Sequence, residues 1–156
     1  MTNNDVLKRV RYLLKLNNNK VSALFKLANH RVSPNEINGW LSKEDDPLFL
    51  EIKDKELAIF LNGLIIEKRG KREGPQPEPE TKLSNNMILR KLKIALNLTT
   101  DEILTLCASV EKPISKNELT DFFRNPNHPS YRVCGSQYLR NFLNALQTNA
   151  DKMSKE

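Results

Sequence analysis

The stretch from Ser84 to Leu98, SNNMILRKLKIALNL, repeats the pattern of the stretch from Thr2 to Leu16, TNNDVLKRVRYLLKL. An offset of 82 positions aligns residues 3–65 with residues 85–147 without a gap, and fifteen of the aligned pairs are identical. The identical pairs are Asn3/Asn85, Asn4/Asn86, Leu7/Leu89, Leu14/Leu96, Leu16/Leu98, Leu24/Leu106, Ser33/Ser115, Asn35/Asn117, Glu36/Glu118, Pro47/Pro129, Leu57/Leu139, Phe60/Phe142, Leu61/Leu143, Asn62/Asn144 and Leu64/Leu146. So many matches at one offset indicate that the chain is a tandem duplication.

Each copy is predicted to form four helices. Apolar residues recur at spacings of three and four, which is typical of a helix with one buried face. Residues that can accept a hydrogen bond from the first helical turn stand at matching places in the two copies. These expected helix starts are Thr2 or Asn3 with Ser84 or Asn85, Asn17 with Thr99, Ser33 with Ser115, and Asp54 with Ser136.

The segment between the copies, GKREGPQPEPETK at residues 70–82, reads as a linker because it contains two glycines and three prolines among polar residues. We therefore expect a first helical repeat at 1–69, this linker at 70–82, a second repeat at 83–150 and a disordered tail at 151–156. A unit of about 65 residues buries only about 60% of the surface that its unfolded chain exposes, and it is marginally stable alone. We therefore expect the two units to pack together. The predicted fold is all-α, with the two four-helix units packed in approximate internal two-fold symmetry.

Composition limits the cellular setting. The 156 residues contain no apolar run near the roughly 20 residues that cross a bilayer, and the polar N-terminus lacks the apolar core of a secretory signal. The two cysteines fit neither a disulfide framework nor a metal-binding spacing. We expect a cytoplasmic protein without a membrane partner.

Several stretches in order resemble one known family. They are NNDVLKRVRYLL, VSPNEINGWLSKEDDP and ELAIFLNGLI in the first copy, and SNNMILRKLKIAL, ISKNELTDFF and YRVCGSQYLRNFLNAL in the second. Together they resemble the YehS-like bacterial family, and the likeness covers nearly the whole chain except the linker and the tail. The resemblance implies a tandemly duplicated helical domain of unknown function, and it implies no catalytic residues.

The residues predict no enzyme, no cofactor and no metal site. His30 aligns with Lys112 and His128 aligns with Asp46, so neither histidine belongs to the duplicated pattern. Cys107 falls on an apolar helix stripe and is expected to pack as a small hydrophobic residue. Cys134 precedes a helix start, where the helix dipole can lower a thiol pKa, and it is the one candidate for a reactive cysteine. The acidic run at Glu44–Asp46 is expected to be a solvated loop.

Positive charge is the clearest functional signal. Residues 1–70 carry twelve basic and nine acidic residues, residues 83–156 carry ten and seven, and the linker is neutral, which gives the net charge of +6. The basic residues proposed to contact the phosphate backbone of nucleic acid lie on or beside the first helix of each copy: Lys8, Arg11, Lys15, Arg90 and Lys93. The alternative is a solvated helix face, because Lys and Arg are good helix formers.

A second hypothesis is that the protein is an interaction or adaptor module that binds a protein partner or associates with itself. Asn62 and Asn144 recur in FLNGL and FLNAL, and the helical wheel places both of them away from the core stripe. Such a pair could mark matched contact surfaces, or it could be a surface residue that outlived the duplication by chance. Overall, the sequence predicts a non-enzymatic binding module, with nucleic acid slightly preferred over a protein partner.

Overall fold

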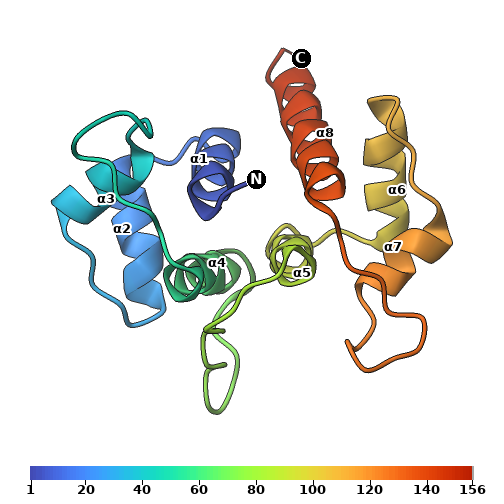
Figure 1. Ribbon diagram of the computed structural model, residues 1–156, viewed down its shortest axis with the longest axis horizontal. Helices are drawn as coiled ribbons and strands as arrows, with labels where there is room; N and C mark the ends of the chain where they lie inside the picture. Colours follow the sequence, from blue (N-terminus) through green and yellow to red (C-terminus); the bar gives the residue numbers. More distant parts are fainter. Residues whose placement is uncertain (156) are drawn as a thin grey trace. The chain divides into compact units, whose positions relative to one another are not determined.

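The computed structural model describes residues 1–155, and every regular element in that part of the chain is an α-helix (Figure 1). The chain divides into two compact units, residues 1–83 and the residues from Ser84 onward. The first unit contains α1 (Asn3–Leu13), α2 (Asn18–Leu27), α3 (Pro34–Leu41) and α4 (Asp54–Arg69). The second contains α5 (Asn85–Ala95), α6 (Thr100–Ser109), α7 (Lys116–Phe122) and α8 (Ser136–Ser154). The prediction of an all-α fold with two tandem four-helix units is confirmed.

Six helices begin at a side-chain cap, and each cap is one of the residues expected from the sequence. In each case the cap oxygen accepts a hydrogen bond from the backbone N–H three residues further on. The capping residues are Thr2, Asn17 and Ser33 in the first unit, and Ser84, Thr99 and Ser115 in the second. Local sequence alone therefore defines the first three helix starts of each unit.

The predicted caps of the fourth helices, Asp54 and Ser136, are wrong by one residue. Lys53 and Gly135 occupy the cap positions, and neither of them supplies a side-chain cap. The Asp54 carboxylate accepts hydrogen bonds from Asn3 Nδ2 at 2.7 Å and from the Leu83 backbone N–H at 2.9 Å. Asp54 therefore ties the start of α4 to α1 and to the end of the linker, and these long-range contacts are invisible in a local pattern.

A buried asparagine fastens the loop after α3 to the first helix. Asn4 is 2% exposed, and its Nδ2 donates to the Trp40 carbonyl at 3.0 Å and to the Leu50 carbonyl at 2.8 Å. Its Oδ1 accepts from the Ile52 backbone N–H at 3.1 Å. The amide thus satisfies the Trp40 carbonyl near the end of α3 and two backbone groups of the irregular segment that leads to α4.

The second unit repeats this arrangement atom for atom. Asn86 Nδ2 donates to the Phe122 carbonyl at 3.0 Å and to the Arg132 carbonyl at 2.8 Å, and Asn86 Oδ1 accepts from Cys134 N at 2.9 Å. The neighbouring Asn85 donates to the Cys134 carbonyl at 3.1 Å. The paired asparagines that open both copies are therefore part of the duplicated fold.

The core of the first unit contains three fully buried aromatic rings. The Phe25 ring stacks on Trp40 with centroids 5.3 Å apart and lies 5.6 Å from the Phe60 ring. Helices α2 and α4 approach so closely at Gly63 that a Cβ atom there would stand 1.9 Å from the Leu24 carbonyl oxygen. Only glycine permits this approach of one backbone to the other.

The predicted linker at residues 70–82 packs on the first unit. Pro77 and Pro79 line a small cavity of about 110 Å³ together with Ile59 and Ile66 of α4. Prolines can cover an apolar helix face without leaving additional N–H donors unpaired. The linker residues accordingly belong to the compact unit formed by residues 1–83.

Part of the predicted disordered tail is helical. Helix α8 continues through Asp151–Ser154, because side-chain hydrogen bonds one turn apart support its last turns. Gln147 Nε2 donates to Asp151 Oδ1 at 2.9 Å, and the Ser154 hydroxyl donates to the Ala150 carbonyl at 3.0 Å. Residue 156 of the predicted tail lies outside the described residues.

Candidate functional sites

Two of the predicted nucleic-acid-binding residues also hold the fold together. Lys8 Nζ donates to the Ser42 carbonyl at 2.7 Å, and the Arg90 guanidinium donates to the Phe123 carbonyl. Ser42 and Phe123 are the C-terminal caps of α3 and α7. A cation at the negative end of a helix dipole is stabilising, so the recurrence of Lys8 and Arg90 has a structural cause.

The other three basic residues differ in their surroundings. Arg11 is half-buried, and its Nε atom has no hydrogen-bond partner within the described residues. The Lys93 ammonium lies 5.7 Å from the centroid of the Phe123 ring, which places it at cation–π distance. Lys15 is exposed and has a φ of 55°, and it lies beyond the end of α1, so it is beside the first helix and not on it. The chain leaves the helix at this point through the left-handed conformation.

The two asparagines predicted to form matched contact surfaces are not equivalent. Asn144 is exposed, but Asn62 is only 8% exposed and lines the cavity beneath the linker. The linker covers the α2 and α4 face in the first unit and therefore buries a side chain that the helical wheel placed outside. The prediction that both asparagines point outward is therefore wrong for Asn62.

Neither cysteine is placed for nucleophilic chemistry. Cys107 is 5% exposed, as expected for a core residue, and burial raises its pKa. Cys134 is 1% exposed, and burial raises the pKa of its thiol to about 11, against the lowering expected from the helix dipole. A protonated, buried thiol is a poor nucleophile.

Within residues 1–155, the histidines and the acidic residues form no metal cluster. His128 is exposed, and its Nδ1 accepts from the Ser130 N–H at 3.0 Å, whereas His30 is half-buried beside the Phe25 ring. Across residues 1–155, no group of three His, Cys, Asp or Glu side chains is placed to hold a metal ion. None of the helices described there is long and apolar enough to span a membrane.

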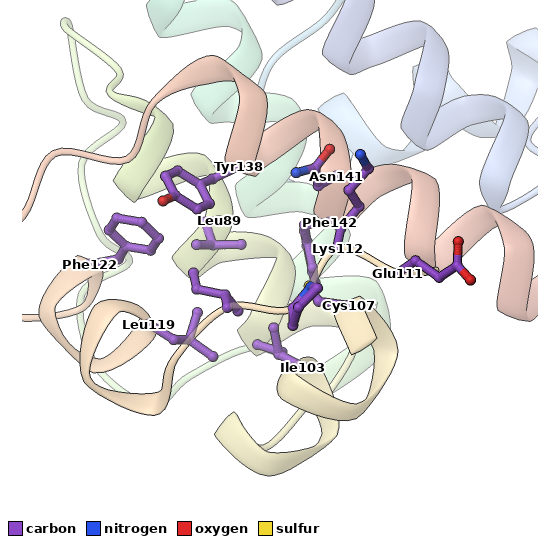
Figure 2. A pocket seen from close by; sticks show the side chains of 12 residues that line it. Leu89, Ile103, Cys107, Glu111, Lys112, Leu119, Phe122, Tyr138, Asn141 and Phe142 are labelled. Carbon is purple, nitrogen blue, oxygen red and sulfur yellow. The ribbon is translucent and has the colours of Figure 1, made fainter. Parts of the chain in front are cut away.

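The second unit contains a cavity of about 230 Å³ that the sequence reasoning did not predict (Figure 2). Its apolar walls come from all four helices of the unit, from Leu89 of α5, Ile103 of α6, Phe122 of α7 and Phe142 of α8. Cys107 lies among these walls. The Tyr138 ring completes the wall beside Phe122, and its hydroxyl is engaged with Glu118 at 2.8 Å.

One signal in the sequence could have revealed this cavity. At the offset of 82 residues, Cys107 corresponds to Phe25 and Phe122 corresponds to Trp40, so the second copy has smaller side chains at both positions.

Two tandem, similarly folded helical units with matched buried asparagines define a duplicated helical-repeat protein. The family model described as "Protein of unknown function (DUF1456)" matches the chain twice, at residues 3–70 and 85–150. The chain is 45% identical over 147 residues to the "Uncharacterized protein YehS" of Escherichia coli (strain K12), with 94% of each chain covered. The chain therefore belongs to the YehS-like family, as its resemblance indicated. No solved structure matches it. The family and this relative are described without an assigned function, and nothing in either description points to an enzymatic activity.

Proposed function

We propose that the chain is a non-enzymatic, cytoplasmic binding protein that contacts the phosphate backbone of nucleic acid through the first helix of each unit. The observation that carries this proposal is the charge of α5, which holds Arg90, Lys91 and Lys93 and no acidic residue. In α1 the single acid is Asp5, whose carboxylate accepts the Thr2 N–H at 3.0 Å in the capping box. Both helices therefore keep an excess of positive charge, and phosphate binding would release condensed counterions.

The structural contacts of Lys8 and Arg90 are compatible with this role. Each side chain donates one hydrogen bond to a backbone carbonyl oxygen and keeps its positive charge. Lys and Arg have further N–H donors that can bind a phosphate oxygen. Because the contacts would be made to phosphates and not to bases, binding would be weakly sequence-selective.

The test is a salt titration of fluorescence anisotropy with labelled duplex DNA and structured RNA. Five phosphate contacts predict a slope of about −4 to −5 for log K against log salt on duplex DNA. In the test variant the five residues Lys8, Arg11, Lys15, Arg90 and Lys93 become glutamine, an uncharged residue that can still donate to a carbonyl.

A matched control removes the same charge elsewhere, by changing five exposed lysines to glutamine: Lys43, Lys53, Lys55, Lys82 and Lys152. The proposal expects the test variant to lose most of its affinity and of its salt dependence, and the control to lose clearly less. Absence of binding at low salt, or equal losses in the two variants, would refute it.

A protein partner is the second candidate, and one observation favours it. Tyr12 and Ile94 occupy equivalent positions in the two copies, and they are 68% and 45% exposed although both are large and apolar. Apolar side chains kept at the same exposed place can contribute to an interaction surface. Self-association would appear as concentration-dependent sedimentation that a Tyr12→Ser, Ile94→Ser variant abolishes. An unchanged monomer at all concentrations would exclude self-association.

A further inference from the structure

The cavity of the second unit has a direct internal reference, because the first unit shows what fills the same place. There the Phe25 ring lies between Trp40, Phe60 and His30, at centroid distances of 5.3, 5.6 and 5.9 Å. Phe25 is fully buried. The site is thus a slot for one aromatic ring, and the first unit fills it with its own side chain.

The second unit retains the slot and lacks the ring. Phe142 repeats Phe60, and Phe122 remains aromatic at the position of Trp40, but Cys107 replaces Phe25. The result is the cavity of about 230 Å³, whose walls are aromatic and aliphatic. An apolar cavity of this size holds a small aromatic molecule, since engineered cavities near 150 Å³ bind benzene.

Two further differences place polar groups at the same cavity. Lys112 replaces His30, and Asn141 replaces Ile59. The Lys112 backbone N–H donates to the Cys107 carbonyl at 3.0 Å, as His30 N–H does to Phe25 in the first unit, so Lys112 is fixed at the C-terminal end of α6 beside Cys107. In Figure 2, Lys112 and Asn141 lie on the same side of the pocket, whereas the Glu111 carboxylate points away from it.

We propose that this cavity is a binding site for a small aromatic carboxylate. Its ring would take the place that Phe25 has in the first unit, packed against Phe122 and Phe142, and its carboxylate would meet the Lys112 ammonium. The Asn141 amide would donate a second hydrogen bond to the carboxylate. Burying a planar ring among aromatic walls supplies most of the affinity, and the cation selects the anionic substituent. This proposal does not depend on nucleic-acid binding, because it uses none of the basic side chains of the first helices.

The experiment titrates the full chain with sodium benzoate and with benzyl alcohol, a neutral ring of similar size, and follows backbone amides by ¹H–¹⁵N NMR. The proposal expects saturable shift changes that centre on Ile103, Cys107 and Phe142 for both probes, with tighter binding of benzoate. Cys107→Phe should abolish binding of both probes, because it restores the missing ring. Cys107→Met should weaken the binding of both probes. This second variant keeps the test valid if Cys107→Phe does not fold.

The role of the cation is tested separately. Lys112→Gln should weaken the binding of benzoate about two- to fivefold, the range expected for a partly exposed charge pair, and leave the binding of benzyl alcohol unchanged. Lys116→Gln is the matched control, because the Lys116 ammonium faces Asp101 at 3.7 Å and does not line the cavity.

Absence of saturable shifts in the second unit, or unchanged affinity in both folded Cys107 variants, would overturn the site. Equal benzoate affinity in Lys112→Gln and Lys116→Gln would overturn the assignment of a carboxylate.

Discussion

Substitution of Asn4 by alanine tests the duplicated asparagine tie most directly. The change removes three hydrogen bonds and leaves the Trp40 carbonyl, the Leu50 carbonyl and the Ile52 N–H without their partner. Two of these bonds are buried, and each orphaned group there costs about 1–3 kcal/mol, while the third is partly buried and costs about 1 kcal/mol. The expected loss in the free energy of unfolding is about 3–7 kcal/mol, and even the lower figure lowers the Tm of a unit this size by roughly 12–24 °C.

The assay is urea unfolding followed by the fluorescence of Trp40, the single tryptophan of the chain, which lies in the core of the first unit. Asn18→Ala is the matched control, because the exposed Asn18 side chain makes one hydrogen bond, to Asn38 at 3.0 Å. The control should lose about 0.5 kcal/mol or less. If Asn4→Ala costs less than about 1 kcal/mol more than the control, the reasoning about the tie is wrong.

Three further predictions concern other contacts. Gly63→Ala should destabilise the first unit by about 3 kcal/mol in urea unfolding, because the new Cβ would stand 1.9 Å from the Leu24 carbonyl oxygen. This clash outweighs the better helix propensity of alanine, and a more stable variant would contradict the prediction. Hydrogen bonds from Asn3 and Leu83 hold the pKa of the Asp54 carboxyl below its usual 3.8. The stability that the ionised carboxylate contributes is therefore present above pH 3.8 and is lost as the pH falls through the lowered pKa. Wild type should therefore lose stability more steeply than Asp54→Asn on acid titration below pH 3.8, and parallel curves would refute the linkage. Because burial raises the Cys134 pKa to about 11, a thiol reagent near neutral pH should modify Cys134 only after unfolding, and rapid modification of the native protein would show that the thiol is accessible.

The sequence predicted the helices well because their signals are local. The caps at Ser33 and Thr99 act over three residues, and the apolar stripes repeat within one helical turn. It failed where a distant segment intervenes, as at Asp54, which is engaged by Asn3 and Leu83, and at Asn62, which lies beneath the linker. The symmetric packing of the two units stays a prediction.

The sequence by itself determined the duplication, the four helices of each copy and the family, because a repeated pattern of apolar and capping residues is readable along the chain without knowledge of contacts. Only the tertiary structure decided what the differences between the copies do. The exchange of Phe25 for Cys107 is a single letter in the alignment, yet a cavity lies beside Cys107, because Phe122 and Phe142 line the place and no third ring fills it. Likewise, the sequence indicates only that Lys8 and Arg90 are charged residues on a helix. The fold shows that each of them donates a hydrogen bond at the C-terminal end of another helix. Packing joins residues that are far apart in the chain, and a linear pattern contains no record of that proximity.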